Sequence, residues 1–136
     1  MDTEEPPLSN EIWTFPDRHL EVVRAGPRTS APPVVLIHGV CHGAWCWHHF
    51  VRFFADRGFE TVAVSLRGHG ASSGRTHLHE LGLDDYVDDV VHVIERLGGE
   101  PVLIGHSMGG AVLQRYLARY SDTVSAAVLF AWRLAR

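Results

Sequence analysis

The sequence predicts an α/β fold in which helices cover both faces of a mostly parallel sheet. From residue 33 onward, short apolar runs alternate with amphipathic helical stretches, and this order is typical of a doubly wound sheet. The apolar runs are continuous, as in strands that are buried on both faces. The connections between them are short, as right-handed crossovers require.

The composition places the chain among soluble globular proteins. Its 136 residues are enough for one domain with a hydrophobic core. The net charge of −4 gives no electrostatic basis for binding nucleic acid or an anionic membrane surface. No apolar run approaches the roughly 18 residues of a membrane span. We therefore expect no nucleic-acid partner and no membrane contact.

The N-terminal region predicts a tail followed by a hairpin. Residues 1–10 are acidic and proline-rich, and they lack the basic and apolar regions of a signal peptide. They predict a mobile tail on a cytoplasmic protein, with the domain spanning residues 11–136. Within residues 11–25, two short stretches alternate apolar and polar side chains, which predicts an antiparallel hairpin.

The first strand–helix unit follows a short loop. Residues 33–37 form a continuous apolar run, which predicts a buried strand. Residues 44–57 carry apolar side chains at helical spacing, and Gly58 is the expected end of that helix. Residues 59–66 predict the next strand. The glycine-rich stretch 67–74 predicts a loop, and no assignment follows for residues 75–82.

The second half continues the alternation. Residues 84–97 predict a helix with one apolar stripe, and two aspartates favour its positive N-terminal end. Residues 101–105 predict a strand, residues 108–120 a helix, and residues 124–131 a last apolar strand. A parallel strand of this kind is normally interior, so its free edge could pair with another chain. Self-association through this edge is therefore a prediction.

The strand at residues 101–105 turns into the next helix through a Gly-x-Ser-x-Gly motif. Such an elbow lifts a serine hydroxyl clear of the sheet, so Ser107 is the candidate nucleophile. Gly105 and Gly109 are expected to be required because a side chain would collide with neighbouring backbone in so tight a turn. The backbone N–H of Met108 would point into the same space and stabilise an oxyanion.

A second oxyanion donor is expected after the first buried strand. The turn that follows His38 and Gly39 could aim the N–H of Val40 at the same oxyanion. His38 itself is expected to be a packed, hydrogen-bonded loop residue. We expect the elbow to direct the His106 side chain away from the serine and His69 to have a structural role.

A cluster of cysteines and histidines at residues 41–49 is the one candidate for a metal site. Cys41 and His42 are expected in a loop, whereas residues 46–49 open a helix, where consecutive side chains point in different directions. No recognised ligand spacing is present. We therefore expect no metal and no cofactor, and the two cysteines make no disulfide framework.

Together these motifs resemble the N-terminal half of an α/β-hydrolase, over about residues 11–131. The matching stretches are His38-Gly39, the Arg-Gly-His-Gly loop at residues 67–72, and the Ser-Met-Gly-Gly elbow. The loop and the elbow resemble bacterial esterases and lysophospholipase-like hydrolases. The resemblance implies a sheet of the α/β-hydrolase type, truncated after about the sixth strand.

Two stretches of the sequence indicate which branch of the family the chain resembles. Residues 38–47 are similar to the plant methylesterase and hydroxynitrile lyase branch. A serine at the elbow argues against the haloalkane dehalogenase and epoxide hydrolase branches, which place aspartate there. The resemblance therefore implies a serine hydrolase that acts on a small-molecule ester.

The sequence departs from the family in the remaining catalytic residues. The resemblance implies a triad in the order Ser, Asp or Glu, His. After Ser107 the chain contains no histidine, and its only acidic residue is Asp122. That residue is expected on the surface at the opposite end of the sheet. Three hypotheses remain. The first is an incomplete copy of a serine esterase with negligible activity. The second is a non-catalytic product, either a truncated chain or a half-domain that pairs with another chain, and the third is a binding module that uses the pocket above the elbow without chemistry.

Overall fold

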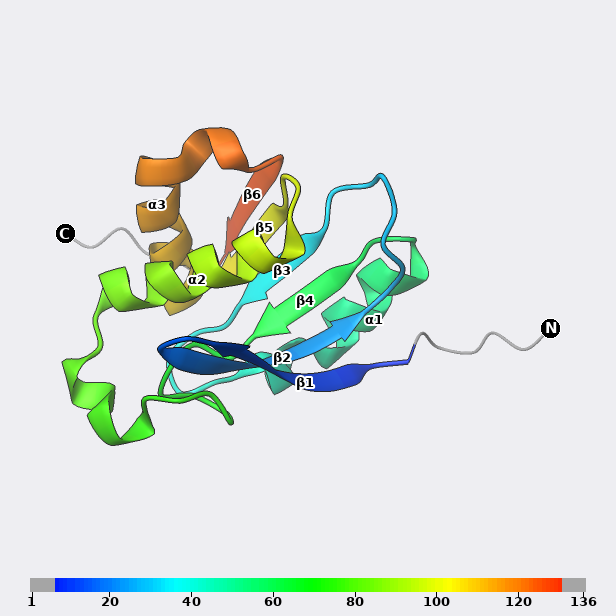
Figure 1. The fold of residues 1–136 in the computed structure, drawn as a ribbon. Coiled ribbons are helices and arrows are strands. Elements are labelled where there is room, and N and C mark those ends of the chain that lie inside the picture. Colours follow the sequence, from blue (N-terminus) through cyan, green and yellow to red (C-terminus); the bar gives the residue numbers. More distant parts are fainter. Residues whose placement is uncertain (1–6, 131–136) are drawn as a thin grey trace.

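A computed structural model describes residues 7–130, which form one six-stranded sheet between helices (Figure 1). The strand order is β1-β2-β4-β3-β5-β6, and β3 to β6 are parallel to one another. β1 and β2 form the predicted antiparallel hairpin, and β2 pairs antiparallel with β4. The strands are β1 (Ser9–Phe15), β2 (Arg18–Ala25), β3 (Val34–Ile37), β4 (Thr61–Val64), β5 (Val102–His106) and β6 (Ala126–Phe130).

Helices cover both faces of the sheet, as the alternation of elements predicts. Alternate side chains of β3 point to opposite faces of the sheet. Val35 and Ile37 lie in the core under α2 and α3, whereas Val34 and Leu36 lie in the core under α1. In Figure 1, α2 crosses in front of the sheet and α1 lies behind it. The helices are η1 (Ala44–Trp47), α1 (His48–Asp56), η2 (Arg75–Glu80), α2 (Leu83–Leu97), α3 (Met108–Tyr120) and η3 (Ser121–Thr123).

Several element boundaries differ from the predicted ones. β1 begins at Ser9, which pairs with Arg24, so the predicted tail of residues 1–10 extends too far. Its first six residues, like residue 131 of the predicted last strand, lie outside the described residues. The predicted strand 59–66 is shorter, because the N–H of Phe59 donates to the carbonyl of Phe54 in the preceding turn.

The helical regions also show two differences. The predicted helix at 44–57 starts as a 3₁₀ turn and becomes α-helical only from His48, which is common at helix termini. Residues 75–80, which had no predicted assignment, form the 3₁₀ helix η2. Its N-cap, Gly74, has a φ of 95°, a backbone conformation that favours glycine.

The parallel strands place the loops that carry the candidate catalytic residues at one end of the sheet, the carboxyl end of the strands. The loop after β3, the glycine-rich loop after β4 and the turn after β5 all leave from carboxyl ends, and ligands of open α/β sheets bind outside this end. Asp122 lies in η3, just before β6, and is exposed. Asp122 therefore lies at the amino end of the parallel strands, whereas the elbow lies at their carboxyl end.

Candidate active site

Ser107 occupies a strained turn between β5 and α3. Its φ of 54° and ψ of −117° lie outside the regions that non-glycine residues ordinarily adopt. Strain of this kind costs about 1–3 kcal/mol and persists where the surroundings hold it in place. Here the Ser107 N–H donates to the carbonyl of Phe130 over 3.1 Å, and the N–H of Gly110 donates to the Ser107 carbonyl over 2.9 Å.

The two glycines of the elbow allow α3 to pack directly against backbone. A Cβ on Gly109 would lie 2.8 Å from the carbonyl oxygen of His38 and closer still to that of Ile37. A Cβ on Gly105 would lie 2.5 Å from the carbonyl oxygen of Gly109. Neither group could move away easily because each belongs to the main chain. A side chain at either glycine would therefore displace the start of α3.

The loop after β3 runs beside the serine. A Cβ on Gly39 would lie 3.2 Å from the Cβ of Ser107, so the loop passes beside Ser107 one residue before Val40. On the other side, Met108 is the first residue of α3, and N–H groups at a helix start have no intrahelical acceptor. The Ser107 hydroxyl itself does not cap the helix and has no hydrogen bond to another described residue.

Ser65 anchors the far end of the same loop. Its hydroxyl accepts a hydrogen bond from the N–H of Ala44 over 2.9 Å and donates one to the carboxylate of Glu21 over 2.8 Å. The Glu21 carboxylate also accepts from the N–H of Ala71 in the glycine-rich loop. The loops that follow β3 and β4 are therefore tied to each other and to β2.

His38 is completely buried and uses both ring nitrogens in the structure. Nδ1 donates to the carbonyl of Gly39 over 2.7 Å, and Nε2 accepts from the N–H of Leu66 over 3.0 Å. This arrangement requires the neutral tautomer with the proton on Nδ1. Burial, together with the neighbouring His69 and His42, lowers the pKa of His38 to about 4. Neither nitrogen is available as a base for Ser107.

The buried imidazole makes stability depend on pH in a defined window. The unfolded chain binds a proton at His38 below its ordinary pKa of 6.5, whereas the folded chain binds one only below about 4. The contribution of His38 to the free energy of unfolding is therefore complete above pH 6.5 and is lost as the pH drops to 4, a loss of about 3 kcal/mol. Urea denaturation at several pH values measures this loss.

A substitution isolates the contribution of His38 to that pH dependence. We expect His38→Gln to be less stable at pH 7 but to lose about 3 kcal/mol less than the wild type between pH 7 and 4. His19→Gln, at an exposed position of β2, serves as the control and should leave the profile unchanged. Parallel profiles for the wild type and His38→Gln would contradict the prediction.

The other candidate histidines near the elbow also contact neighbouring groups. The ring of His69 packs 4.8 Å from that of His38, and its Nδ1 lies 3.0 Å from the carbonyl of Arg67. The ring of His106 stacks on His42 at 6.2 Å and lies 5.1 Å from the ring of Phe130. The structure thus gives both histidines packing partners of their own.

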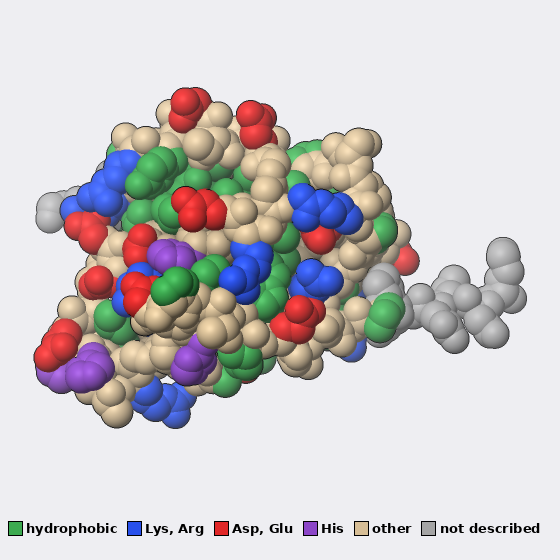
Figure 2. Space-filling model, in the orientation of Figure 1, with side chains coloured by type: hydrophobic (Ala, Val, Ile, Leu, Met, Phe, Trp, Pro, Cys, Tyr) green, Lys and Arg blue, Asp and Glu red, His purple; other side chains and the backbone are tan. Residues whose placement is uncertain are grey.

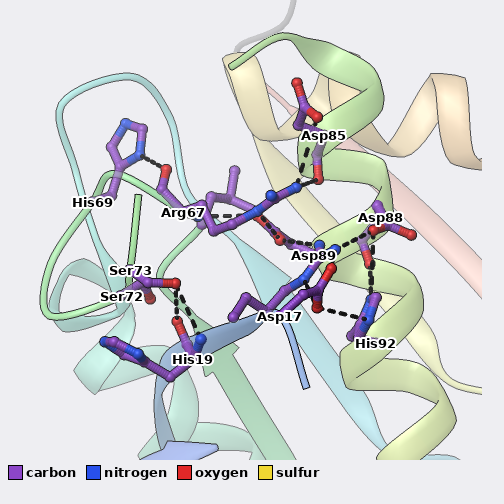
Figure 3. A network of polar contacts seen from close by, with 12 residues as sticks. Asp17, His19, Arg67, His69, Ser72, Ser73, Asp85, Asp88, Asp89 and His92 are labelled. Atoms are coloured by element: carbon purple, nitrogen blue, oxygen red, sulfur yellow. Dashed lines mark hydrogen bonds and ion pairs between the residues drawn. The ribbon is translucent and has the colours of Figure 1, made fainter. Parts of the chain in front are cut away.

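A buried ionic network supports the glycine-rich loop, and sequence reasoning missed it (Figure 3). The carboxylate of Asp89 on α2 is fully buried and accepts from the N–H and Nε of Arg67, over 3.0 and 2.7 Å, and from Arg18, over 2.8 Å. Burial raises the pKa of Asp89, and these donors limit the rise. Arg18 also pairs with Asp17 and Asp88.

A sequence signal for this network was present. Asp89 lies three residues after Tyr86 and four before Val93, on the buried side of α2. A lone carboxylate on the apolar stripe of a helix requires a buried cation, but its partners are 71 and 22 residues away in sequence. On the face shown in Figure 2, basic and acidic side chains lie interspersed around these elements.

Comparison with known proteins agrees with this architecture. A family model described as the alpha/beta hydrolase fold matches residues 32–132. The chain belongs to the α/β-hydrolase family. Methyl jasmonate esterase 1 of Vitis vinifera is 35% identical over 97 residues, which cover 69% of this chain and 36% of that protein. A bifunctional esterase/perhydrolase of Acinetobacter calcoaceticus is 42% identical over 106 residues, covering 76% of this chain and 37% of that enzyme.

Solved structures share the hydrolase fold at the same partial coverage. A thioesterase domain from the curacin biosynthetic pathway superposes with a TM-score of 0.86 at 21% identity, over 96% of this chain and 48% of that one. Epoxide hydrolase A from Mycobacterium thermoresistibile gives 0.82 at 27% identity, over 90% and 39%. The chain spans less than two fifths of the two curated relatives named above.

Two further findings concern the described part of the chain. No helix within residues 7–130 is both long and apolar enough to cross a membrane. Among the same residues, no group of three or more His, Cys, Asp or Glu side chains could hold a metal ion. Cys41 and Cys46 are both free thiols.

Proposed function

We propose that Ser107 is the nucleophile of a serine hydrolase that cleaves small-molecule carboxylic esters. The observation that carries the proposal is the strained backbone of Ser107, with a φ of 54°, at the junction of β5 and the N-terminus of α3. Strain is retained at functional sites where it holds a reacting group in position. The similarity to proteins named as esterases supports the ester as the substrate class.

The chemistry follows from the groups around the elbow. The Ser107 oxygen would attack the ester carbonyl carbon while its proton passes to a base, and the carbonyl oxygen would become an oxyanion. The N–H groups of Met108 and Val40 would stabilise this oxyanion, and one such donor contributes about 100- to 1,000-fold to the rate. Collapse would expel the alcohol and leave an acyl-serine, which water then hydrolyses with help from the same base.

The general base and its supporting acid are the two groups that this proposal still requires. The sequence has no histidine after Ser107, and Asp122 lies at the opposite end of the parallel strands from Ser107. His38 is held neutral by two hydrogen bonds. We therefore assign the general base and the triad acid to residues outside these 136. Without a base, a triad enzyme keeps only the contribution of binding and the oxyanion hole.

This assignment predicts negligible ester turnover by the 136-residue chain. Hydrolysis of p-nitrophenyl butyrate should occur at the same rate with the wild type and with Ser107→Ala, because the hydroxyl is not activated. Preparations of both variants from an esterase-deficient host provide the comparison. A rate that falls on substitution of Ser107 would show that the base lies within the chain and would overturn the assignment.

A non-catalytic role is the second candidate, and the lack of any hydrogen-bond partner for the Ser107 hydroxyl among the described residues favours it. In that case the elbow would belong to a binding module or to a half-domain that acts only with another chain. A fluorophosphonate probe reacts with activated serines. Neither candidate predicts labelling of Ser107 in the 136-residue chain. Labelling of Ser107 in a protein that also carries the remaining part of the domain, detected by intact mass, would count against the non-catalytic role. On a separate point, both cysteines are free thiols, and thiols stay reduced in the cytoplasm. This supports the cytoplasm as the proposed place of action.

A further inference from the structure

The loop of residues 38–44 carries Val40, one of the two oxyanion donors of the proposed function, and we call it the oxyanion loop. The N–H of Val40 shares a planar trans peptide unit with the carbonyl of Gly39, and the two groups point in opposite directions. The Gly39 carbonyl accepts from Nδ1 of His38 over 2.7 Å and from the N–H of His42 over 3.2 Å. The direction of the Val40 N–H is therefore set by contacts on the other side of the same peptide plane.

The oxyanion loop is strained at its centre. Cys41 has a φ of 61°, a value that residues other than glycine adopt rarely. Such a conformation persists only where the surrounding contacts hold it in place. At the start of the loop, β3 and the side chain of His38 provide these contacts. At the end of the loop, they begin with the N–H of Ala44.

Ser65 receives the end of the oxyanion loop. The N–H of Ala44 donates to the Ser65 hydroxyl over 2.9 Å, and Ser65 is completely buried. A Cβ on Gly43 would lie 3.3 Å from the same hydroxyl oxygen, so the loop backbone passes directly beside it. A hydroxyl has one proton to donate and lone pairs with which to accept. Its rotation therefore decides whether the bond from Ala44 can form.

Glu21 sets the rotation of that hydroxyl. Ser65 donates its proton to the Glu21 carboxylate over 2.8 Å. Because a carboxylate only accepts hydrogen bonds, the Ser65 proton points to Glu21 and the lone pairs remain for Ala44. A hydrogen bond to a charged acceptor is stronger than a neutral one and polarises the next bond in the chain. The carboxylate on β2 therefore strengthens the bond that holds the oxyanion loop.

The position of Glu21 is itself fixed by its neighbours. Its N–H donates to the hydroxyl of Ser72 over 2.8 Å, and its carbonyl accepts from the N–H of Ser65 over 2.9 Å. Its carboxylate also accepts from the N–H of Ala71. A Cβ on Gly70 would lie 2.6 Å from the Ser65 hydroxyl and closer still to the Glu21 carboxylate. The glycine-rich loop thus packs its backbone directly against this pair of side chains.

We propose that Glu21, acting through Ser65, is a positioning residue for the oxyanion donor Val40, an inference that rests on the proposed function. Glu21 acts on the oxyanion loop and not on the ester: it holds the end of the loop so that the Val40 N–H meets the developing charge. The oxyanion forms only after the serine attacks, and the bound ester does not carry this charge. A misdirected donor therefore lowers kcat and leaves KM unchanged.

A chimera tests the catalytic part of the proposal. Residues 1–130 are joined to the part of the Acinetobacter esterase that follows its matched region, and kcat and KM are measured with p-nitrophenyl butyrate. Glu21→Ala and Ser65→Ala should each lower kcat by at least about tenfold and change KM by less than about twofold. Glu21→Gln should keep kcat within about threefold of the parent, because its amide oxygen can accept the same two hydrogen bonds.

The double variant tests whether Glu21 acts through Ser65. Two residues of one hydrogen-bond chain have non-additive effects, so Glu21→Ala combined with Ser65→Ala should be about as slow as Ser65→Ala alone. If the two losses of kcat multiply instead, Glu21 does not act through Ser65 and the proposal is wrong.

Glu11 provides the matched control. Its carboxylate also accepts hydrogen bonds, from Ser9 and Trp13, and it pairs with Arg24. It lies on β1, which β2 and β4 separate from β3 and the oxyanion loop. Glu11→Ala should leave kcat within about twofold of the parent. Equal losses of kcat for Glu11→Ala and Glu21→Ala would overturn the positioning role.

Hydrogen exchange in the 136-residue chain separates this inference from the proposed function. Glu21→Ala should speed the exchange of the Ala44 N–H by at least about tenfold and leave the amides of β3 unchanged. This readout does not require Ser107 to react, and unchanged exchange at Ala44 would overturn the proposal.

The two readouts together distinguish the possible failures. A chimera with Ser107-dependent hydrolysis in which Glu21→Ala leaves kcat unchanged would overturn the positioning role, and the proposed function would stand. A chimera without Ser107-dependent hydrolysis would contradict the proposed function, and the exchange of Ala44 would then decide whether Glu21 holds the loop.

Discussion

Replacing Asp89 with alanine is expected to lower the free energy of unfolding by about 3–5 kcal/mol, because it leaves buried charges without their partner. The Arg18 side chain is only 4% exposed, and that of Arg67 is 17% exposed. Both guanidinium groups donate to the Asp89 carboxylate. A loss of this size is a large part of the stability of a domain. Urea denaturation followed by circular dichroism measures it.

The neighbouring carboxylate provides the matched control. Asp88 also pairs with Arg18, at 2.6 Å, but its side chain is 48% exposed. Water screens such a pair, so Asp88→Ala should cost less than about 1 kcal/mol. Equal losses for the two variants would show that burial does not determine the strength of this network.

Gly109→Ala is expected to be the most damaging single change at the elbow, with a loss of about 3 kcal/mol. The added methyl group would overlap the carbonyl oxygens of Ile37 and His38, and neither belongs to a flexible side chain. α3 would have to move away from β3, and Met108 would move with it. Urea denaturation measures the loss of stability.

Gly82→Ala is the control for this substitution. Gly82 precedes α2 with a φ of −119°, and a Cβ there would meet no atom within 4 Å. Its N–H would still donate to the Asp85 carboxylate. The change should cost less than about 1 kcal/mol. If the two alanine variants were equally stable, close backbone packing at Gly109 would not be the reason for glycine in this motif.

The order of the helices and strands could be predicted because each element is encoded by its own residues. The helices at 83–97 and 108–120 carry their apolar stripes and end signals within their own residues. The elbow was predictable for the same reason, since Gly105, Ser107 and Gly109 act within a single turn. Strand ends were less accurate. The limits of β4 depend on a hydrogen bond to Phe54 in the preceding turn and on one between Ser65 and Glu21, which are 44 residues apart.

The parts of the site that depend on long-range contacts could not be predicted. The neutral state of His38 depends on its acceptance of the Leu66 N–H, and the position of Ala44 depends on Ser65. The φ of Cys41 is positive, 61°, although the residue is not a glycine, and no side-chain pattern marks this position of the loop beside the serine. The Asp89 network joins residues from β2, α2 and the loop after β4. Such partners become neighbours only when the sheet is assembled.

The most direct test of the central claim is ester hydrolysis by the chimera that adds the remaining part of a relative to residues 1–130. The claim is that these residues supply the nucleophile and the oxyanion donors and that the base lies outside them. We expect the chimera to hydrolyse p-nitrophenyl butyrate at least 1,000-fold faster than the 136-residue chain, and Ser107→Ala to abolish this gain. A folded chimera whose hydrolysis is unchanged by Ser107→Ala would contradict the claim.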